Sequence, residues 1–152
     1  EQIDPDIMRQ PPRDPDQPMF GRRILLISAL QGLSVLAVVL AVYLWAMHDG
    51  QTAGEIRTIT FATLVFGNLA LILVNRSWRL PIPATFRQRR NATLKWILAG
   101  ATTILVLLIS VPVLREAFGL GPMSLQDWAI ALVAAVVGVS WFEIYKTLNT
   151  RH

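Results

Sequence analysis

Long apolar runs separated by short polar connections dominate the chain. The clearest run covers residues 24–47 and contains no charged residue. As a helix it would reach about 36 Å, enough to cross the roughly 30 Å hydrocarbon core of a bilayer. Further runs lie at about 58–75, 94–114 and 125–145. A soluble domain of this size could not bury so much apolar surface. The pattern therefore predicts an all-α membrane protein with four transmembrane helices in a bundle, a domain covering residues 24–152.

Polar and proline positions mark where these helices begin and end. Residues 1–23 are rich in Pro, Asp and Arg, and their five prolines forbid a continuous helix, which predicts an extended arm. Pro112 falls in the last turn of the third run, where a kink or a helix end costs little. Ser124 followed by Asp127 predicts an N-terminal cap for the fourth helix.

The basic residues predict the orientation of the helices. Four lie in the arm, six lie in or just after the connection between the second and third runs, and two lie in the tail. The other two connections hold only Arg57 and Arg115. Since Lys and Arg accumulate on the cytoplasmic side, we expect both chain ends to be cytoplasmic. The net charge is +4, and the basic residues flank the apolar runs. Lipid head groups are therefore a better expected partner than nucleic acid.

Catalytic and metal-binding patterns are missing from the sequence. It contains no Gly-rich phosphate loop and no cysteine. Its two histidines, His48 and His152, are too few and too far apart for a metal cluster. Asp127 and Glu143 lie near opposite ends of one predicted helix and cannot act as a pair. We therefore expect no catalytic, cofactor-binding or metal-binding residue in this chain.

Two amides inside the apolar runs are the candidates for function. Polar residues in a membrane helix often line an ion or substrate path, or they hydrogen-bond to a neighbouring helix. Asn68 is open to both interpretations, whereas Gln31, with serines three residues before and after it, is interpreted as packing. The last run carries small residues at a spacing that permits close helix approach, namely Ala131 with Ala135 and Ala134 with Gly138.

Four segments, in order, resemble P-type cation-transporting ATPases. Asp6-Ile-Met-Arg-Gln-Pro-Pro-Arg13 resembles the loop after the sixth transmembrane helix of that family, with Gln10 inserted as is common in bacterial members. The segment from Thr60 to Asn68 is similar to the eighth helix, and that from Pro122 to Trp128 to the start of the tenth. The tail from Phe142 to Lys146 resembles the closing Glu-x-x-Lys pattern.

The resemblance implies the last four of ten helices of an ATP-driven cation pump, in a bacterial plasma membrane. Its partners would be the bilayer, the transported cation, and the other helices and cytoplasmic domains of the parent pump. The parent would use ATP and Mg, but the Asp-Lys-Thr-Gly motif of the phosphorylated Asp is absent here, so this chain alone should be inactive. Asn68 matches an eighth-helix position that carries Glu in calcium pumps and Gln in sodium-potassium pumps. The first residue, Glu1, is consistent with a processed chain or a piece of a longer one.

Two other interpretations remain open at this point. The chain could be a free-standing four-helix scaffold or regulatory subunit without transport activity. A small drug-proton antiporter is ranked below both, because such a protein needs a carboxylate embedded in its first helix and residues 24–47 contain none.

Glycosylation tests the predicted orientation. Asn75-Arg-Ser77 and Asn91-Ala-Thr93 match the acceptor sequence, and both belong to the connection expected in the cytoplasm. Neither should be modified when the chain is inserted into eukaryotic microsomes, as judged by its mobility on a gel. Glycosylation at either asparagine would show that the orientation is the opposite of the predicted one.

Overall fold

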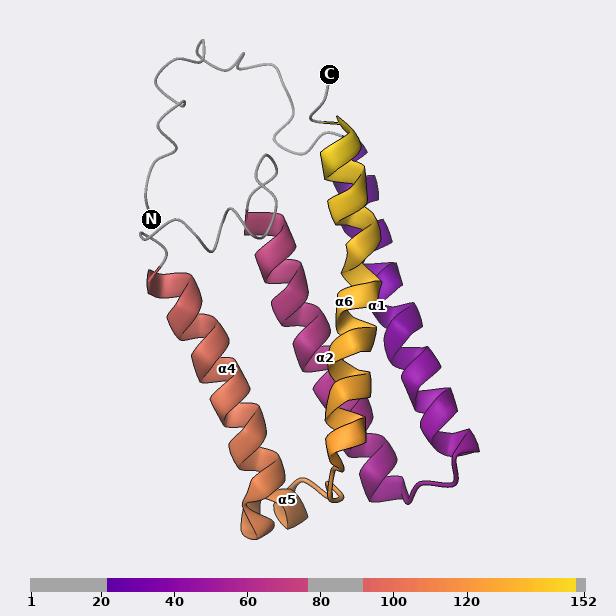
Figure 1. Cartoon of the computed structure of the whole chain (residues 1–152), viewed down its shortest axis with the longest axis vertical. Coiled ribbons are helices and arrows are strands. Elements are labelled where there is room, and N and C mark those ends of the chain that lie inside the picture. Colours follow the sequence, from indigo (N-terminus) through magenta and orange to yellow (C-terminus); the bar gives the residue numbers. More distant parts are fainter. Residues whose placement is uncertain (1–21, 77–91, 150–152) are drawn as a thin grey trace.

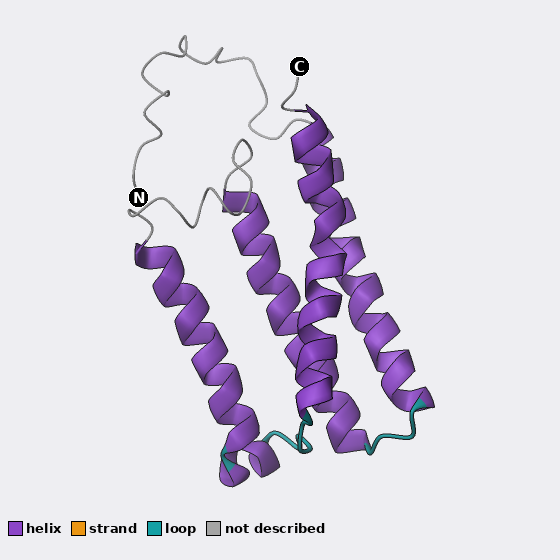
Figure 2. Ribbon diagram, viewed as in Figure 1, coloured by secondary structure: helices purple, strands orange, loops and turns teal. Residues whose placement is uncertain are grey.

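The fold consists of helices that run up and down beside one another (Figure 1). The computed structural model describes residues 22–76 and 92–149, and every regular element within those ranges is a helix (Figure 2). The helices are α1 (Arg22–His48), α2 (Ala53–Arg76), α4 (Ala92–Ser110), α5 (Pro112–Ala117) and α6 (Leu125–Asn149). The connections at 49–52 and 118–124 lie at one end of the molecule, here called the loop end, and the start of α1 and the end of α6 lie at the other (Figure 1).

Three of these helices are long and apolar enough to cross a membrane, over Leu25–His48, Ala53–Asn75 and Leu125–Ile144. A fourth apolar stretch, Leu94–Ser110, is shorter. Large side chains on these helices stay exposed, for example Leu36 at 60% and Leu132 at 52%, as lipid-facing residues do. The predicted all-α membrane fold is therefore confirmed. The expected arm over 1–23, apart from its last two residues, and most of the basic connection lie outside the described residues.

Pro112 divides the third predicted run. We expected one helix over about 94–114, whereas α4 ends at Ser110 and α5 begins at Pro112. Val111, between them, is extended at φ −86° and ψ 114°, the conformation that a following proline favours. Proline also lacks the N–H that would continue the helical ladder. The chain therefore turns at this point before it reaches α6.

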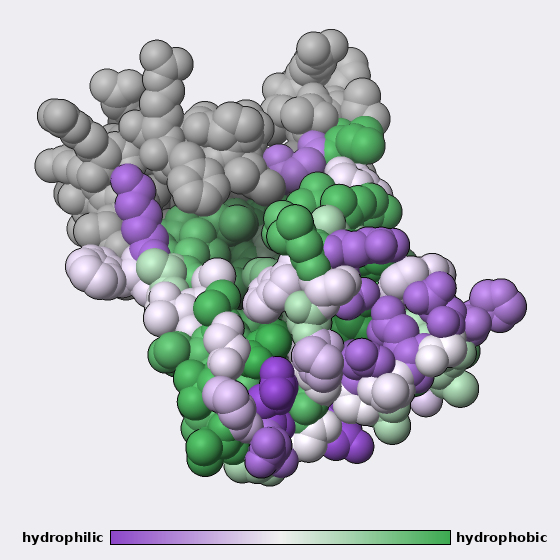
Figure 3. All heavy atoms as spheres, turned by 60° about the horizontal axis from the view of Figure 1, so that its bottom comes forward, coloured by the Kyte–Doolittle hydropathy of each residue, from purple (hydrophilic) through white to green (hydrophobic). Residues whose placement is uncertain are grey.

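Two helices begin at the loop end with the same capping arrangement. Asp127 Oδ2 accepts hydrogen bonds from the backbone N–H of Ser124 (2.9 Å) and from its hydroxyl (2.7 Å), so the predicted cap of α6 is confirmed. Glu55 Oε2 accepts the equivalent pair from Thr52, both at 2.8 Å, at the start of α2. Each of these capping arrangements satisfies N–H donors that the start of a helix would otherwise leave without a partner. Hydrophilic residues gather over this end of the molecule (Figure 3).

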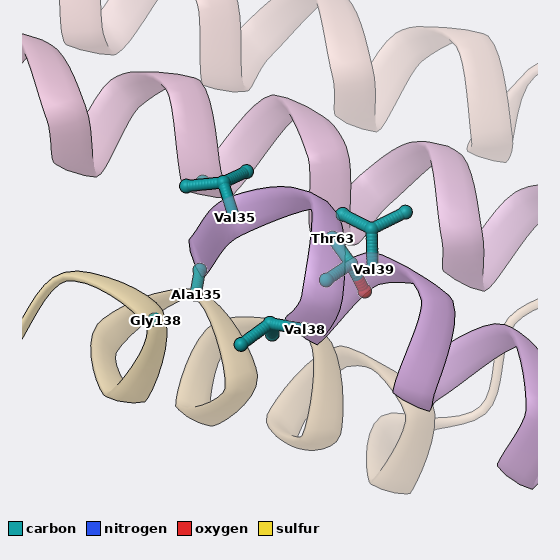
Figure 4. A pocket seen from close by; sticks show the side chains of 7 residues that line it. Val35, Val38, Val39, Thr63, Ala135 and Gly138 are labelled. Carbon is teal, nitrogen blue, oxygen red and sulfur yellow. The ribbon is translucent and has the colours of Figure 1, made fainter. Parts of the chain in front are cut away.

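Small residues let α1, α2 and α6 meet closely at their centre. A Cβ built on Gly138 of α6 would lie 3.2 Å from Val38 Cγ2, and one built on Gly67 of α2 would lie 2.9 Å from Val35 Cγ1. Ala135, 3% exposed, completes the contact (Figure 4). Within the bilayer, helices associate by such close packing, because lipid supplies no hydrophobic force between them. The predicted small-residue spacing on α6 thus faces α1.

A backbone contact joins the start of α2 to the connection before α6. The hydroxyl of the fully buried Thr58 donates to the Gly54 carbonyl (2.8 Å) and accepts from the Gly121 N–H (2.8 Å). A Cβ on Gly121 would lie 2.5 Å from the backbone nitrogen of Glu55 and 2.7 Å from the carbonyl carbon of Gly54. Only glycine fits there without displacing α2, so this contact fixes the distance between α2 and α6 at the loop end.

Gly121→Ala should therefore destabilise the fold. The added methyl has to displace backbone atoms, and overpacking of this kind costs about 1–3 kcal/mol of unfolding free energy. Gly100→Ala is the matched control, because nothing lies within 4 Å of a Cβ at that position. Thermal unfolding in detergent measures both variants. Equal stability of the two would show that Gly121 does not set the spacing between α2 and α6.

Candidate functional site

The chemistry available to this domain comes from polar side chains within its membrane helices. In residues 22–76 and 92–149, no group of three or more His, Asp or Glu side chains is placed to hold a metal ion. The carboxylates of Glu55 and Asp127 are engaged in helix caps at the loop end. The two intramembrane amides, Gln31 and Asn68, therefore have to be compared by their surroundings.

Gln31 is part of the packing between α1 and α2. Its side chain is 4% exposed, and its Nε2 donates to Asn75 Oδ1 at 2.9 Å. The neighbouring Ser34 donates its hydroxyl to the Leu30 carbonyl at 2.9 Å, within its own helix. A buried amide paired with a second amide is satisfied without an ion. The interpretation of Gln31 as a packing residue is confirmed.

Asn68 lies in a different environment, on an exposed face of α2. Arg57, Phe61, Leu64 and Ile72 are exposed on the same helix, at spacings of three or four residues from one another and from Asn68. Such spacing places all five side chains on one stripe of a helix. We call this stripe the open face of α2. No residue in the described part of the chain hydrogen-bonds to the Asn68 side chain.

The other faces of α2 are occupied by the helices of this chain. Ile59 and Ala62 are buried in one cluster with residues of α1, α4 and α6, and Val74 is buried in a second cluster with α1 and α6. Thr63 is also buried, and its hydroxyl donates to the Ile59 carbonyl at 2.7 Å, as threonines in membrane helices often do. Asn68 is thus directed away from the contacts that hold α2 in place.

Sequence reasoning missed the partner of Gln31. Asn75 stands at the end of α2, 44 positions along the chain, and its role within the acceptor sequence for glycosylation gave no sign of a helix contact. The cap at Thr52 and Glu55 was missed as well, although the Thr-x-x-Glu spacing carries a signal. The contact through Thr58 had no signal beyond the two glycines that it joins.

Comparison with known proteins finds one family. A family model described as "Cation transporting ATPase, C-terminus" matches residues 1–148, which is nearly the whole chain. A comparison with curated proteins finds no match.

Proposed function

The chain belongs to the family of cation-transporting ATPase C-termini, and on this basis we propose that Asn68 borders the ion path of the parent pump. As a C-terminal membrane domain of such an ATPase, it would support the helices that move the ion. The observation that carries the proposal is the open face of α2. It presents an amide in the membrane, with no partner in the described part of the chain.

The free-energy cost of an unsatisfied amide in the membrane supports a place for Asn68 beside the ion path. An amide in hydrocarbon loses its hydrogen bonds to water, so it is costly unless another group satisfies it. Gln31 meets this requirement with Asn75 inside the domain. Asn68 would meet it from outside, through the other helices of the pump and the ion between them. A carboxamide oxygen is a suitable ligand for hard cations, although it brings no charge. The negative charge for the site would then come from the other helices.

The orientation of the domain belongs to the same proposal. Helix α1 begins with Arg22 and Arg23, at the end of the molecule that α2 leaves and α4 enters. In the sequence, twelve of the fourteen Lys and Arg residues precede α1, join α2 to α4 or follow α6, or belong to the helix turns next to those segments. The loop end has Arg57 and Arg115. The positive-inside rule would place the first end in the cytoplasm. There it would connect to the cytoplasmic domains that use ATP and Mg in the parent pump.

The variant Asn68→Leu tests whether Asn68 is an ion ligand or only a lipid-facing residue. The two side chains have the same number and branching of heavy atoms, so the change removes the amide and keeps the shape of the side chain. In the parent pump we expect the cation concentration for half-maximal ATPase activation to rise on the order of tenfold, in the range typical for a lost partner at a metal site. Ile72→Ala, one turn further along the open face, is the control and should leave cation activation unchanged.

The stability of the same variants excludes a packing explanation. In the isolated domain, Asn68→Leu should not lower the thermal unfolding temperature, because no described residue bonds to Asn68, whereas Gln31→Leu should lower it. Unchanged cation activation of the Asn68→Leu pump would contradict the proposal, whatever its effect on stability.

A further inference from the structure

A groove opens between α1 and α2 near the loop end. Its walls include Tyr43 and Met47 of α1 and Ile56, Phe61 and Leu64 of α2, and it encloses about 530 Å³. This volume falls within the range of about 300–1,000 Å³ that small-ligand sites occupy. The three-helix contact of Figure 4, by contrast, leaves no room for a water molecule. The groove is therefore of ligand size, beside the buried cluster in which α1 and α2 contact each other.

Arg57 is the one charged residue that lines this groove. Its Nη1 donates to the Gly119 carbonyl at 2.7 Å, and Gly119 has a φ of +62°, which places its backbone against the guanidinium. This bond uses one of five guanidinium donors and holds the group in place. Within the described ranges no carboxylate forms an ion pair with Arg57. A preorganised cation with free donors is therefore available to an anion.

The position of the groove matches the layers of a bilayer. Its residues belong to the ends of the spans Leu25–His48 and Ala53–Asn75, and Arg57 lies only about 6 Å along α2 from the start of the second span. A bilayer whose hydrocarbon core begins after the first turns of α2 would place Arg57 near the lipid phosphates and Phe61 and Leu64 further toward the hydrocarbon. Tyr43 is of the type that lines membrane interfaces. The positive-inside rule does not account for Arg57, because Arg57 lies at the loop end, where basic residues are few.

A threonine side chain also belongs to the wall of the groove. Thr60 lines the groove, and its Oγ1 is buried without a hydrogen-bond partner in the described part of the chain. Thr58 and Thr63, on the same helix, both bond to the carbonyl four residues earlier. An unsatisfied buried hydroxyl is costly.

We propose that this groove binds an anionic phospholipid. The phosphate accepts hydrogen bonds from the free donors of Arg57, and one acyl chain lies along Tyr43, Phe61 and Leu64. Charge complementarity selects this ligand, because the groove joins one unpaired cation to an apolar wall, and a phospholipid joins one anion to an apolar chain.

Lipid binding to the full chain tests the proposal. Native mass spectrometry in detergent micelles measures the affinities for dioleoyl phosphatidylglycerol and dioleoyl phosphatidylcholine, and the first should bind more tightly. Arg57→Gln should lower the affinity for phosphatidylglycerol about fivefold, the effect expected of one basic residue near an anionic lipid. Arg115→Gln is the matched control, since Arg115 lies toward the same end but does not line the groove, and it should leave the affinity unchanged.

A second variant tests the apolar part independently. Ala53 lines the groove at the exposed start of α2, so Ala53→Phe should fill the groove and weaken the binding of both lipids. Thermal unfolding without lipid checks that each variant is folded. If Arg57→Gln does not fold, the lipid affinity of Ala53→Phe tests the proposal instead. Equal losses for Arg57→Gln and Arg115→Gln would overturn the proposal, because they indicate non-specific surface attraction. Full affinity in Ala53→Phe would overturn it too, and would leave the groove to another occupant such as a helix of the pump.

Discussion

Close approach of α6 to α1 and α2 is the constraint on which the rest of this structure depends. In a bilayer, lipid solvates an apolar side chain as well as a neighbouring helix does, so association requires tight packing and shared hydrogen bonds. Gly138 and Gly67 admit Val38 and Val35 at the centre of the three helices. At the loop end, the Gly121 backbone reaches α2, where Thr58 bonds to it. These contacts determine which side of each helix is used within the chain.

The open face of α2 and the groove both follow from this arrangement. Once α1 and α6 occupy their sides of α2, Asn68 stays exposed. Helix α4 contributes the buried Leu105 and Ile109 to the cluster shared with α1, α2 and α6. Toward the loop end the same stripe supplies Arg57 to the groove. One helix thus presents an exposed neutral amide at Asn68 and an exposed cation at Arg57.

The sequence predicts more of the fold than of the site, and the reason is physical. Run length and charge placement identify the membrane helices, and local chemistry identifies the Ser124 cap. Pro112 indicated a kink or a helix end, although the run was expected to continue to residue 114. In a helix that is apolar all round, however, periodicity does not distinguish the packed face from the lipid face. The pairing of Gln31 with Asn75 and the placement of Arg57 against Gly119 depend on contacts between residues 44 and 62 positions apart. Neither contact leaves a local pattern to find.

Cysteine cross-linking measures the close approach of α1 and α6 directly, because the chain contains no cysteine. The Cβ of Val38 lies 3.6 Å from a Cβ built on Gly138, within the range of about 3.5–4.5 Å that a disulfide needs. Chains with Val38→Cys and Gly138→Cys are oxidised in membranes and cut by trypsin in the basic connection at 77–91. The two fragments should stay joined until reduced, whereas Val38→Cys with Val136→Cys, whose α6 position is 55% exposed, should give separate fragments. Cross-linking of the second pair without the first would contradict the arrangement of α1 and α6.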